Sequence, residues 1–183
     1  IYADDLVDLF GVDAVRYYVL HEMPFASDGT LTYELMIERI NTELANILGN
    51  LVNRTVAMAN KYLGGKVAYK GVCADCDADL KATAIAAREG VEAKMNDYRV
   101  ADALEEIISL ARRSNKYIDE TEPWALAKNE EKRDRLETVL FNLLESIRFI
   151  GTLLYPFMPE TADKIIAQIG AEKCDIVSLS NFA

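Results

Sequence analysis

Apolar side chains recur every three or four residues along most of this chain of 183 residues, which is the spacing that gathers them on one face of an α-helix. The longest run predicts a helix over residues 32–63, with Thr32 as its N-cap and Gly64 directly after it. Its apolar positions are Met36, Ile40, Leu44, Ile47, Leu48, Leu51, Thr55 and Met58. The same reasoning predicts helices over residues 2–9, 12–22, 78–95, 99–118, 130–154 and 159–169, and a short one that begins at Pro123.

Strand patterns are almost missing. No segment alternates apolar and polar residues for long, and the most we expect is a brief extended stretch at residues 67–69. We therefore predict an all-α fold, a helical bundle with short connections. Turn-forming residues at Pro24, Ser27, Asp28 and Gly29 mark a boundary between leading helices in residues 1–30 and the bundle in residues 31–183.

Acidic side chains outnumber basic ones by 30 to 20, which gives a formal net charge of −10. This balance argues against a protein that binds nucleic acid through many phosphate contacts, but it leaves room for local reading of unpaired RNA bases. The sequence has no apolar run long enough to span a membrane and no secretion leader. Its three cysteines suit a reducing compartment, so we expect a cytoplasmic protein with no membrane partner.

Residues with catalytic or metal-binding chemistry are few. Cys73 and Cys76 form a Cys-x-x-Cys pair, but a structural zinc site needs four ligands. The remaining soft ligands, Cys174 and His21, are distant in the sequence. No Ser or Cys nucleophile elbow accompanies His21, so it has no partner for a catalytic triad. Neither glycine-rich phosphate-binding motif, G-x-G-x-x-G or G-x-x-x-x-G-K-[ST], occurs. We therefore expect no catalytic residue, no bound metal and no cofactor in this chain.

The long predicted helix also carries a polar stripe. Its members are Asn46, Asn50, Asn53 and Arg54, with Arg39 on the same side. At 100° per residue these positions lie opposite the apolar stripe. An ordinary solvent-facing surface, or hydrogen bonding to nearby loops, explains the pattern. Recognition of base edges explains it as well, because amide and guanidinium groups offer the planar, paired hydrogen bonds that unstacked bases need.

Trp124 is the one tryptophan in the chain, and Pro123 fixes the backbone just before it. A half-buried indole that anchors a turn to the bundle accounts for this residue. A platform on which an unstacked base lies accounts for it equally. The pattern alone leaves both hypotheses open.

Several longer segments form a combined pattern. They are residues 10–18 (FGVDAVRYY), residues 22–29 (EMPFASDG), the Asn-rich block from Arg39 to Arg54, Glu122-Pro-Trp124 followed by Lys128, and residues 153–159 (LLYPFMP). Together they resemble the methionyl-tRNA synthetases, over nearly the whole chain from Tyr2 to about Gly170. The last segment is shared with several other class I synthetases, so the specificity of the resemblance rests on the others.

This resemblance implies a function. The family couples methionine to its tRNA with ATP, on a Rossmann catalytic domain whose two signature motifs are not in this sequence. The chain would then be the anticodon-binding region, inactive alone, with the catalytic domain as its partner in the same longer chain. The leading helices would belong to the stem-contact region. Family members read the CAU anticodon of methionine tRNA with an Asn, an Arg and a tryptophan, which correspond here to Asn50, Arg54 and Trp124; Asn46 and Arg39 match further family positions.

Two alternatives compete with this interpretation. The first is the anticodon-binding region of an isoleucyl-, valyl-, leucyl- or cysteinyl-tRNA synthetase, since these share the bundle and the segment at residues 153–159. The pairing of Asn50 and Arg54 with a later Pro-Trp is the methionyl pattern and argues against them. The second is a helical protein-interaction module with no role in RNA binding, which an acidic surface would also suit.

Overall fold

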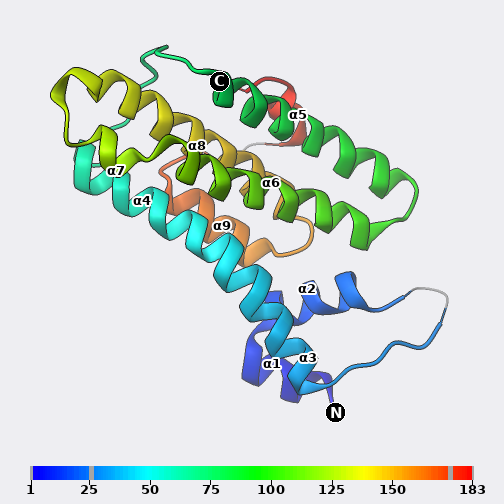
Figure 1. Ribbon diagram of the computed structural model, residues 1–183. Coiled ribbons are helices and arrows are strands. Elements are labelled where there is room, and N and C mark those ends of the chain that lie inside the picture. Colours follow the sequence, from blue (N-terminus) through cyan, green and yellow to red (C-terminus); the bar gives the residue numbers. More distant parts are fainter. Residues whose placement is uncertain (1, 25–26, 173–174, 183) are drawn as a thin grey trace.

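The computed structural model describes residues 2–24, 27–172 and 175–182, and helices make up almost all of its regular structure (Figure 1). Phe25 and Ala26 of the segment at residues 22–29, and Cys174, lie outside the described residues. In chain order the elements are α1 (Ala3–Phe10), α2 (Val12–Glu22), α3 (Tyr33–Arg39), the π-helix η1 (Ile40–Gly49), α4 (Asn50–Leu63), α5 (Asp75–Asn96), α6 (Val100–Thr121), α7 (Pro123–Leu126), the 3₁₀ turn η2 (Glu130–Lys132), α8 (Arg133–Leu154), α9 (Pro159–Gln168) and the 3₁₀ turn η3 (Ile176–Ser180).

A long rod built from α3, η1 and α4 crosses the molecule (Figure 1). On one side of it lie the long helices α5, α6 and α8, with α9 packed against α8. At the other end α1, α2 and α3 form a smaller group near the N-terminus. Two apolar clusters fill the interior, a large one within the bundle and a small one built from Leu6, Tyr18 and Met36. The rod therefore connects the leading helices to the bundle.

Polar contacts attach α2 to the bundle at the turn between α8 and α9. The Arg16 guanidinium donates from Nε to the carbonyl of Phe157 and from Nη2 to that of Pro156, at 2.8 Å each. Asp13 Oδ2 accepts the amide of Thr161, in the first turn of α9, at 2.6 Å. Two segments at opposite ends of the sequence, residues 10–18 and 153–159, thus meet in the fold.

The all-α prediction is confirmed, and the differences are local. No strand occurs within residues 2–24, 27–172 and 175–182, so residues 67–69 are simply irregular there. The helix expected from residue 130 begins as the 3₁₀ turn η2, and η3 forms after the last expected helix and buries Leu179 completely. The division near residue 30 stays a prediction, and Tyr17 on α2 already belongs to the large cluster of the bundle.

The one unexpected feature of the rod is its π-helical middle. The amide of Asn50 donates to the carbonyl of Ala45, five residues earlier, whereas in an α-helix it would donate to the carbonyl four residues earlier. A Cβ on Gly49 would lie 3.1 Å from the carbonyl oxygen of Leu44, so this wider turn also brings backbone close to a glycine. The rotation per residue in η1 differs from the 100° of an α-helix. A helix face assigned to residues of α3 therefore does not continue as the same face in α4.

Candidate nucleic-acid interface

The polar residues of the rod are accessible. Asn46, at the exposed side of η1, and Asn50 and Asn53 on α4 are all exposed, and Arg54 is partly exposed. Helix α4 forms here because its other face supplies Leu51, Val52 and Thr55 to the buried interior. The asparagines are poor helix formers, so their helical conformation depends on this packing and not on their own propensity.

Arg54 reaches across to α6. Its Nη2 lies 3.1 Å from Oδ1 of Asp119, and the two side chains are 31% and 66% exposed. Ion pairs that are this accessible to water contribute little to stability, about 0–1 kcal/mol. The contact uses a single nitrogen of the guanidinium, so the planar fork of Arg54 stays able to bind another acceptor in the same region.

Trp124 projects from α7, a single turn that follows α6 almost at once. Glu122 adopts the left-handed conformation, with φ of 44°, and this reverses the chain so that Pro123 is buried. The indole itself remains 38% exposed. Asp119 lies only five residues before Trp124, so its contact with Arg54 brings the arginine and the tryptophan to the same end of the bundle (Figure 1). A binding role was predicted for both residues from the sequence, but their arrangement in space was not.

Asn53 and Arg54 point to different sides of α4. Asn53 lines a cavity of about 610 Å³ whose other walls include Phe10, Val56 and Gln168. That cavity lies among the α1–α2 turn, the rod and α9, away from the contact of Arg54 with α6. Adjacent helical positions differ by about 100°, which explains the separation. The single stripe expected from the sequence is therefore split between two surfaces.

Arg39 takes part in a network at the junction of α2 with the rod. Its Nη2 lies 2.5 Å from Glu22 Oε1 and its Nη1 lies 2.8 Å from Glu43 Oε1. Burial acts to lower the pKa of the Arg39 guanidinium, but the two carboxylates outweigh it and raise this pKa above its ordinary value. The geometry gives Arg39 a structural role within the chain, apart from the surface that carries Asn50 and Arg54.

Sequence analysis missed the centre of that network. Glu43 is 2% exposed, and its Oε2 accepts a hydrogen bond from the hydroxyl of Tyr17 on α2. Burial first, and then Glu43 itself, raises the pKa of Tyr17 far above its usual range, so the phenol remains a donor. One signal was present in the sequence: Glu43 follows the apolar Met36 by seven residues, two helical turns along the same face.

The Cys-x-x-Cys pair lies where the loop before α5 ends. Cys73 is exposed, with its sulfur 3.3 Å from the hydroxyl of Tyr69, and Cys76 is half-buried in the first turn of α5. Burial and the carboxylate of Asp77 raise the pKa of the Cys76 thiol, which favours its protonated, unreactive form. His21 lies elsewhere, between α2, η1 and α6, so the described residues do not bring it to the cysteines.

A search for membrane-spanning segments gives a negative result within the part of the chain that the structure describes. None of those helices combines the length and the apolar character that crossing a bilayer requires.

Two family models match this chain. Residues 1–56 match tRNA synthetases class I (M), and residues 67–180 match the anticodon binding domain of methionyl tRNA ligase. Both matches name the methionyl type, which favours the main interpretation over the other class I synthetases and over an unrelated interaction module. The second match alone covers more than half of the chain.

Individual relatives agree. The methionine–tRNA ligase of Clostridium perfringens is 48% identical over 177 residues, which are 97% of this chain and 27% of that protein. The ligase of Caldanaerobacter subterraneus is 51% identical over 166 residues, 91% of this chain and 26% of the relative. Among solved structures, the Mycobacterium tuberculosis methionyl-tRNA synthetase in complex with methionyl-adenylate superposes with a TM-score of 0.94 and 36% identity, over 100% of this chain and 37% of that one. The chain thus spans about a quarter of the length of the two relatives, and it belongs to the methionyl-tRNA ligase family, in the region that includes the anticodon-binding domain.

Proposed function

We propose that this chain recognises the CAU anticodon of methionine tRNA as part of a longer methionine–tRNA ligase. The observation that carries the proposal is the ion pair of Arg54 with Asp119, in the last turn of α6, which leads directly into α7 and Trp124. A partly exposed indole offers a face on which an unstacked base can lie, and a guanidinium fork suits a base edge. Asn50 is exposed one turn before Arg54 and supplies an amide near the same surface.

The other expected residues contribute less in this proposal. Asn46 precedes Asn50 on the exposed part of the rod and extends the same surface. Asn53 faces the cavity beside α9, and Arg39 is held by Glu22 and Glu43, so neither is assigned a base. The ligase reaction, with its ATP, belongs to a catalytic domain elsewhere in the longer protein, which we place in the cytoplasm. This chain alone should show no methionine-dependent exchange of pyrophosphate into ATP.

Binding of a labelled anticodon stem-loop, followed by fluorescence anisotropy, tests the proposal. Trp124→Ala and Arg54→Ala should each weaken binding by about tenfold or more, since stacking on an aromatic ring is worth ~1–3 kcal/mol per base and ~1.4 kcal/mol is tenfold. A stem-loop with an altered anticodon should bind the unmodified protein about as weakly as the CAU stem-loop binds either variant. Circular dichroism should report unchanged helicity, because both side chains are accessible.

Matched controls lie at the other end of α6. Tyr98 is an aromatic residue that is 84% exposed, and Arg99 is paired with Asp102 at 2.6 Å much as Arg54 is paired with Asp119. At 1.5 Å per residue, α6 separates the two pairs by roughly 28 Å. Tyr98→Ala and Arg99→Ala should therefore leave stem-loop binding unchanged. Equal losses from the control and test variants, or unchanged affinity in Arg54→Ala with an unfolded Trp124→Ala, would refute the anticodon assignment.

A further inference from the structure

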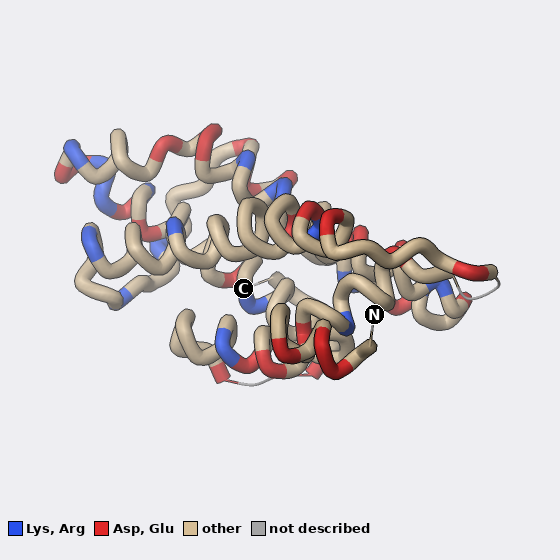
Figure 2. Tube along the Cα trace, turned by 90° about the horizontal axis from the view of Figure 1, so that it is seen from below, with Lys and Arg blue, Asp and Glu red and all other residues tan. Residues whose placement is uncertain are grey.

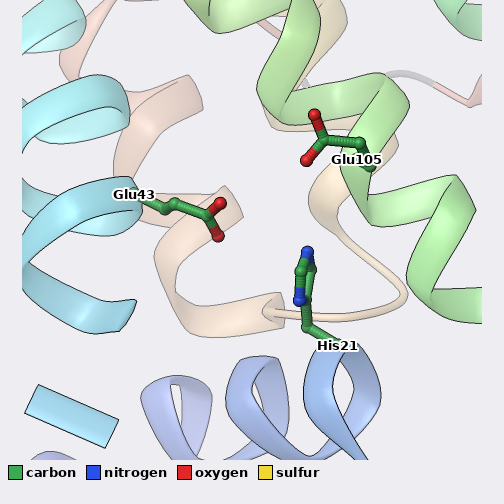
Figure 3. A group of neighbouring side chains, drawn as sticks. All are labelled: His21, Glu43 and Glu105. Carbon is green, nitrogen blue, oxygen red and sulfur yellow. The ribbon is translucent and has the colours of Figure 1, made fainter. Parts of the chain in front are cut away.

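The junction of α2, η1 and α6 holds a group of side chains to which neither the fold nor RNA binding assigns a purpose. His21 projects from α2 between Glu43 on η1 and Glu105 on α6, and Figure 3 shows its ring directed toward both carboxylates. One ring nitrogen and one oxygen from each carboxylate lie within 4.8 Å of one another. The three ligand-bearing residues thus come from three different elements that pack together here.

The hydrogen bond at the other side of the ring fixes which nitrogen is free. His21 Nδ1 lies 2.8 Å from Glu22 Oε1, and because an ionised carboxylate only accepts, Nδ1 must carry a hydrogen. In the neutral ring this leaves a lone pair on Nε2. That atom is buried, and within the described residues it has no hydrogen-bond partner. Stacking of the ring on Tyr17, at 5.5 Å between centroids, holds it in place.

The carboxylates of Glu43 and Glu105 already accept hydrogen bonds from Arg112, but the lone pair on Nε2 faces only acceptors, and a cation placed among the three groups would satisfy it. The charges of the cluster lead to the same conclusion. Three carboxylates, on Glu22, Glu43 and Glu105, face two guanidinium groups, on Arg39 and Arg112, which leaves one negative charge uncompensated. A carboxylate that holds the far nitrogen of a histidine is also the arrangement that orients metal-binding imidazoles in proteins.

We propose that His21, Glu43 and Glu105 bind a divalent transition-metal ion of the zinc class. One imidazole nitrogen and two carboxylate oxygens are a ligand set that zinc accepts, with water in the fourth position. Ligand atoms of a tetrahedral zinc ion, at about 2.1 Å from it, lie ~3.4 Å apart, so the present spacing of up to 4.8 Å must contract by as much as about 1.4 Å. Glu105 can move in this way because its side chain is 46% exposed.

Arg112 is the residue that must give way. It contacts Glu105 through Nη1 and reaches Glu43 Oε1 through Nη2 at 3.3 Å. Its side chain is 42% exposed, so it can turn into solvent when the ion arrives. Arg39 contacts Glu22 through Nη2 and also donates from Nη1 to Glu43 Oε1 at 2.8 Å, so the ion must use a lone pair of the Glu43 carboxylate that Arg39 does not occupy. A cavity of about 390 Å³ borders His21, the one proposed ligand among its lining residues.

The chain has a single histidine, so its imidazole gives one unambiguous signal. The test titrates zinc into a protein in which Cys73, Cys76 and Cys174 are replaced by serine, because thiolates would otherwise compete for the ion. Calorimetry should report one zinc ion per chain. Long-range proton–nitrogen NMR should show a large shift of Nε2 and a small shift of Nδ1. Bound zinc should also raise the midpoint of thermal unfolding, because the folded state alone presents the three ligands together.

Variants localise the ion. Glu105→Gln, at an accessible position, and His21→Gln should each weaken zinc binding by at least tenfold. Glu89→Gln replaces an exposed glutamate outside the cluster and should leave the affinity unchanged. An Nε2 resonance that responds to pH but not to zinc would show that a proton is the cation held here and would overturn the proposal. Zinc binding that Glu105→Gln does not weaken would overturn it too.

Discussion

Asp77, in the first turn of α5, has hydrogen bonds to both of its carboxylate oxygens. Arg135 donates from Nη1 to Oδ2 at 2.5 Å and from Nη2 to Oδ1 at 2.8 Å, and the hydroxyl of Tyr117 donates to Oδ1 at 2.6 Å. The residue is 2% exposed. Its removal leaves the Arg135 charge without its partner in a partly buried position, so Asp77→Ala should lower the free energy of unfolding by ~3–5 kcal/mol.

Urea unfolding measures this loss, and a neighbouring ion pair provides the control. Asp79, one half-turn further along α5, pairs with Arg113 but is itself 66% exposed. Water screens such a pair, so Asp79→Ala should change the free energy of unfolding by less than about 1 kcal/mol. Similar losses from both variants would show that burial of Asp77 is not the reason for its contribution.

The same carboxylate makes stability depend on acid pH. Burial acts to raise the pKa of Asp77, but hydrogen bonds from Arg135 and Tyr117 outweigh it and hold this pKa below its ordinary value of 3.8. Its contribution is therefore complete above pH 3.8 and disappears as pH falls through the lowered value. In urea unfolding below pH 4, the stability difference between the unmodified protein and Asp77→Asn should narrow. A difference that stays constant with pH would contradict the assignment.

At the same residue scale, a conservative change at Arg54 separates charge from geometry. Arg54→Lys keeps the positive charge and the reach toward Asp119, but it replaces the planar fork by a compact ammonium. If Arg54 binds a base edge, the lysine variant should lose most of the stem-loop affinity that Arg54→Ala loses, in the anisotropy assay described above. Near-complete retention of affinity in the lysine variant would instead indicate a phosphate contact.

Exposed polar residues were easier to predict from the sequence than buried ones. The exposure of Arg54, Asn50 and Trp124 is compatible with the binding role that the family resemblance implied, and that role stays a prediction. Glu43 was not identified, because a charged residue on a predicted helix is expected to face solvent unless its partners are known. Those partners, Tyr17 and Arg112, are 26 and 69 residues away, and no periodicity along the chain reveals them.

At the scale of elements, the positions of the helices along the chain were largely predictable, but the face that each helical residue presents was not. The run of residues 32–63 is one continuous rod, as expected, yet its middle third is the π-helix η1. Intrinsic preferences do not favour a π-helix. Its presence depends on tertiary contacts, which include the buried contact of Glu43 with α2. Arg39 and Asn46 therefore serve different surfaces, although a uniform helix would align them.

Gly151, in the last turn of α8, allows α9 to pack closely. A Cβ at this position would lie 2.9 Å from Cδ1 of Ile166 and 3.3 Å from Cγ2 of Ile165. Alanine is the better helix former by about 0.5–1 kcal/mol, but overpacking of a buried contact costs ~1–3 kcal/mol. Gly151→Ala should therefore lower the free energy of unfolding by about 1–2 kcal/mol.

A second substitution shows whether steric contact is the cause. Ile166→Val removes the Cδ1 atom that the new methyl group would meet. In that background Gly151→Ala should cost clearly less than it does alone, which urea unfolding of the four proteins in a double-mutant cycle measures. Additive losses would mean that Ile166 is not the obstacle to the new methyl group.

At the scale of the whole molecule, composition predicted the fold class and the charge, but not the meeting of distant segments. The large core combines residues from α2, the rod and all the long helices of the bundle. Arg16 joins the turn before α9 across more than a hundred residues of sequence. Such contacts depend on how the helices pack, which a single sequence does not specify.

The overall charge leads to the last prediction. The protein carries a formal net charge of −10, and Figure 2 shows Lys and Arg positions interspersed with acidic ones along the backbone. RNA held mainly by stacking on Trp124 and by base-edge contacts of Arg54 releases few counterions.

For single strands each phosphate contact contributes about 0.7 to the slope of log affinity against log salt concentration, so two contacts give ~1.4. Anisotropy titrations of the CAU stem-loop over a range of salt concentrations should therefore give a slope with a magnitude below about 2. Trp124→Ala should lower the affinity at every salt concentration and leave this slope unchanged, because an indole neutralises no phosphate. A steep slope of about 4 or more would mean that many phosphates are contacted, and the predominance of base contacts in recognition would then be wrong.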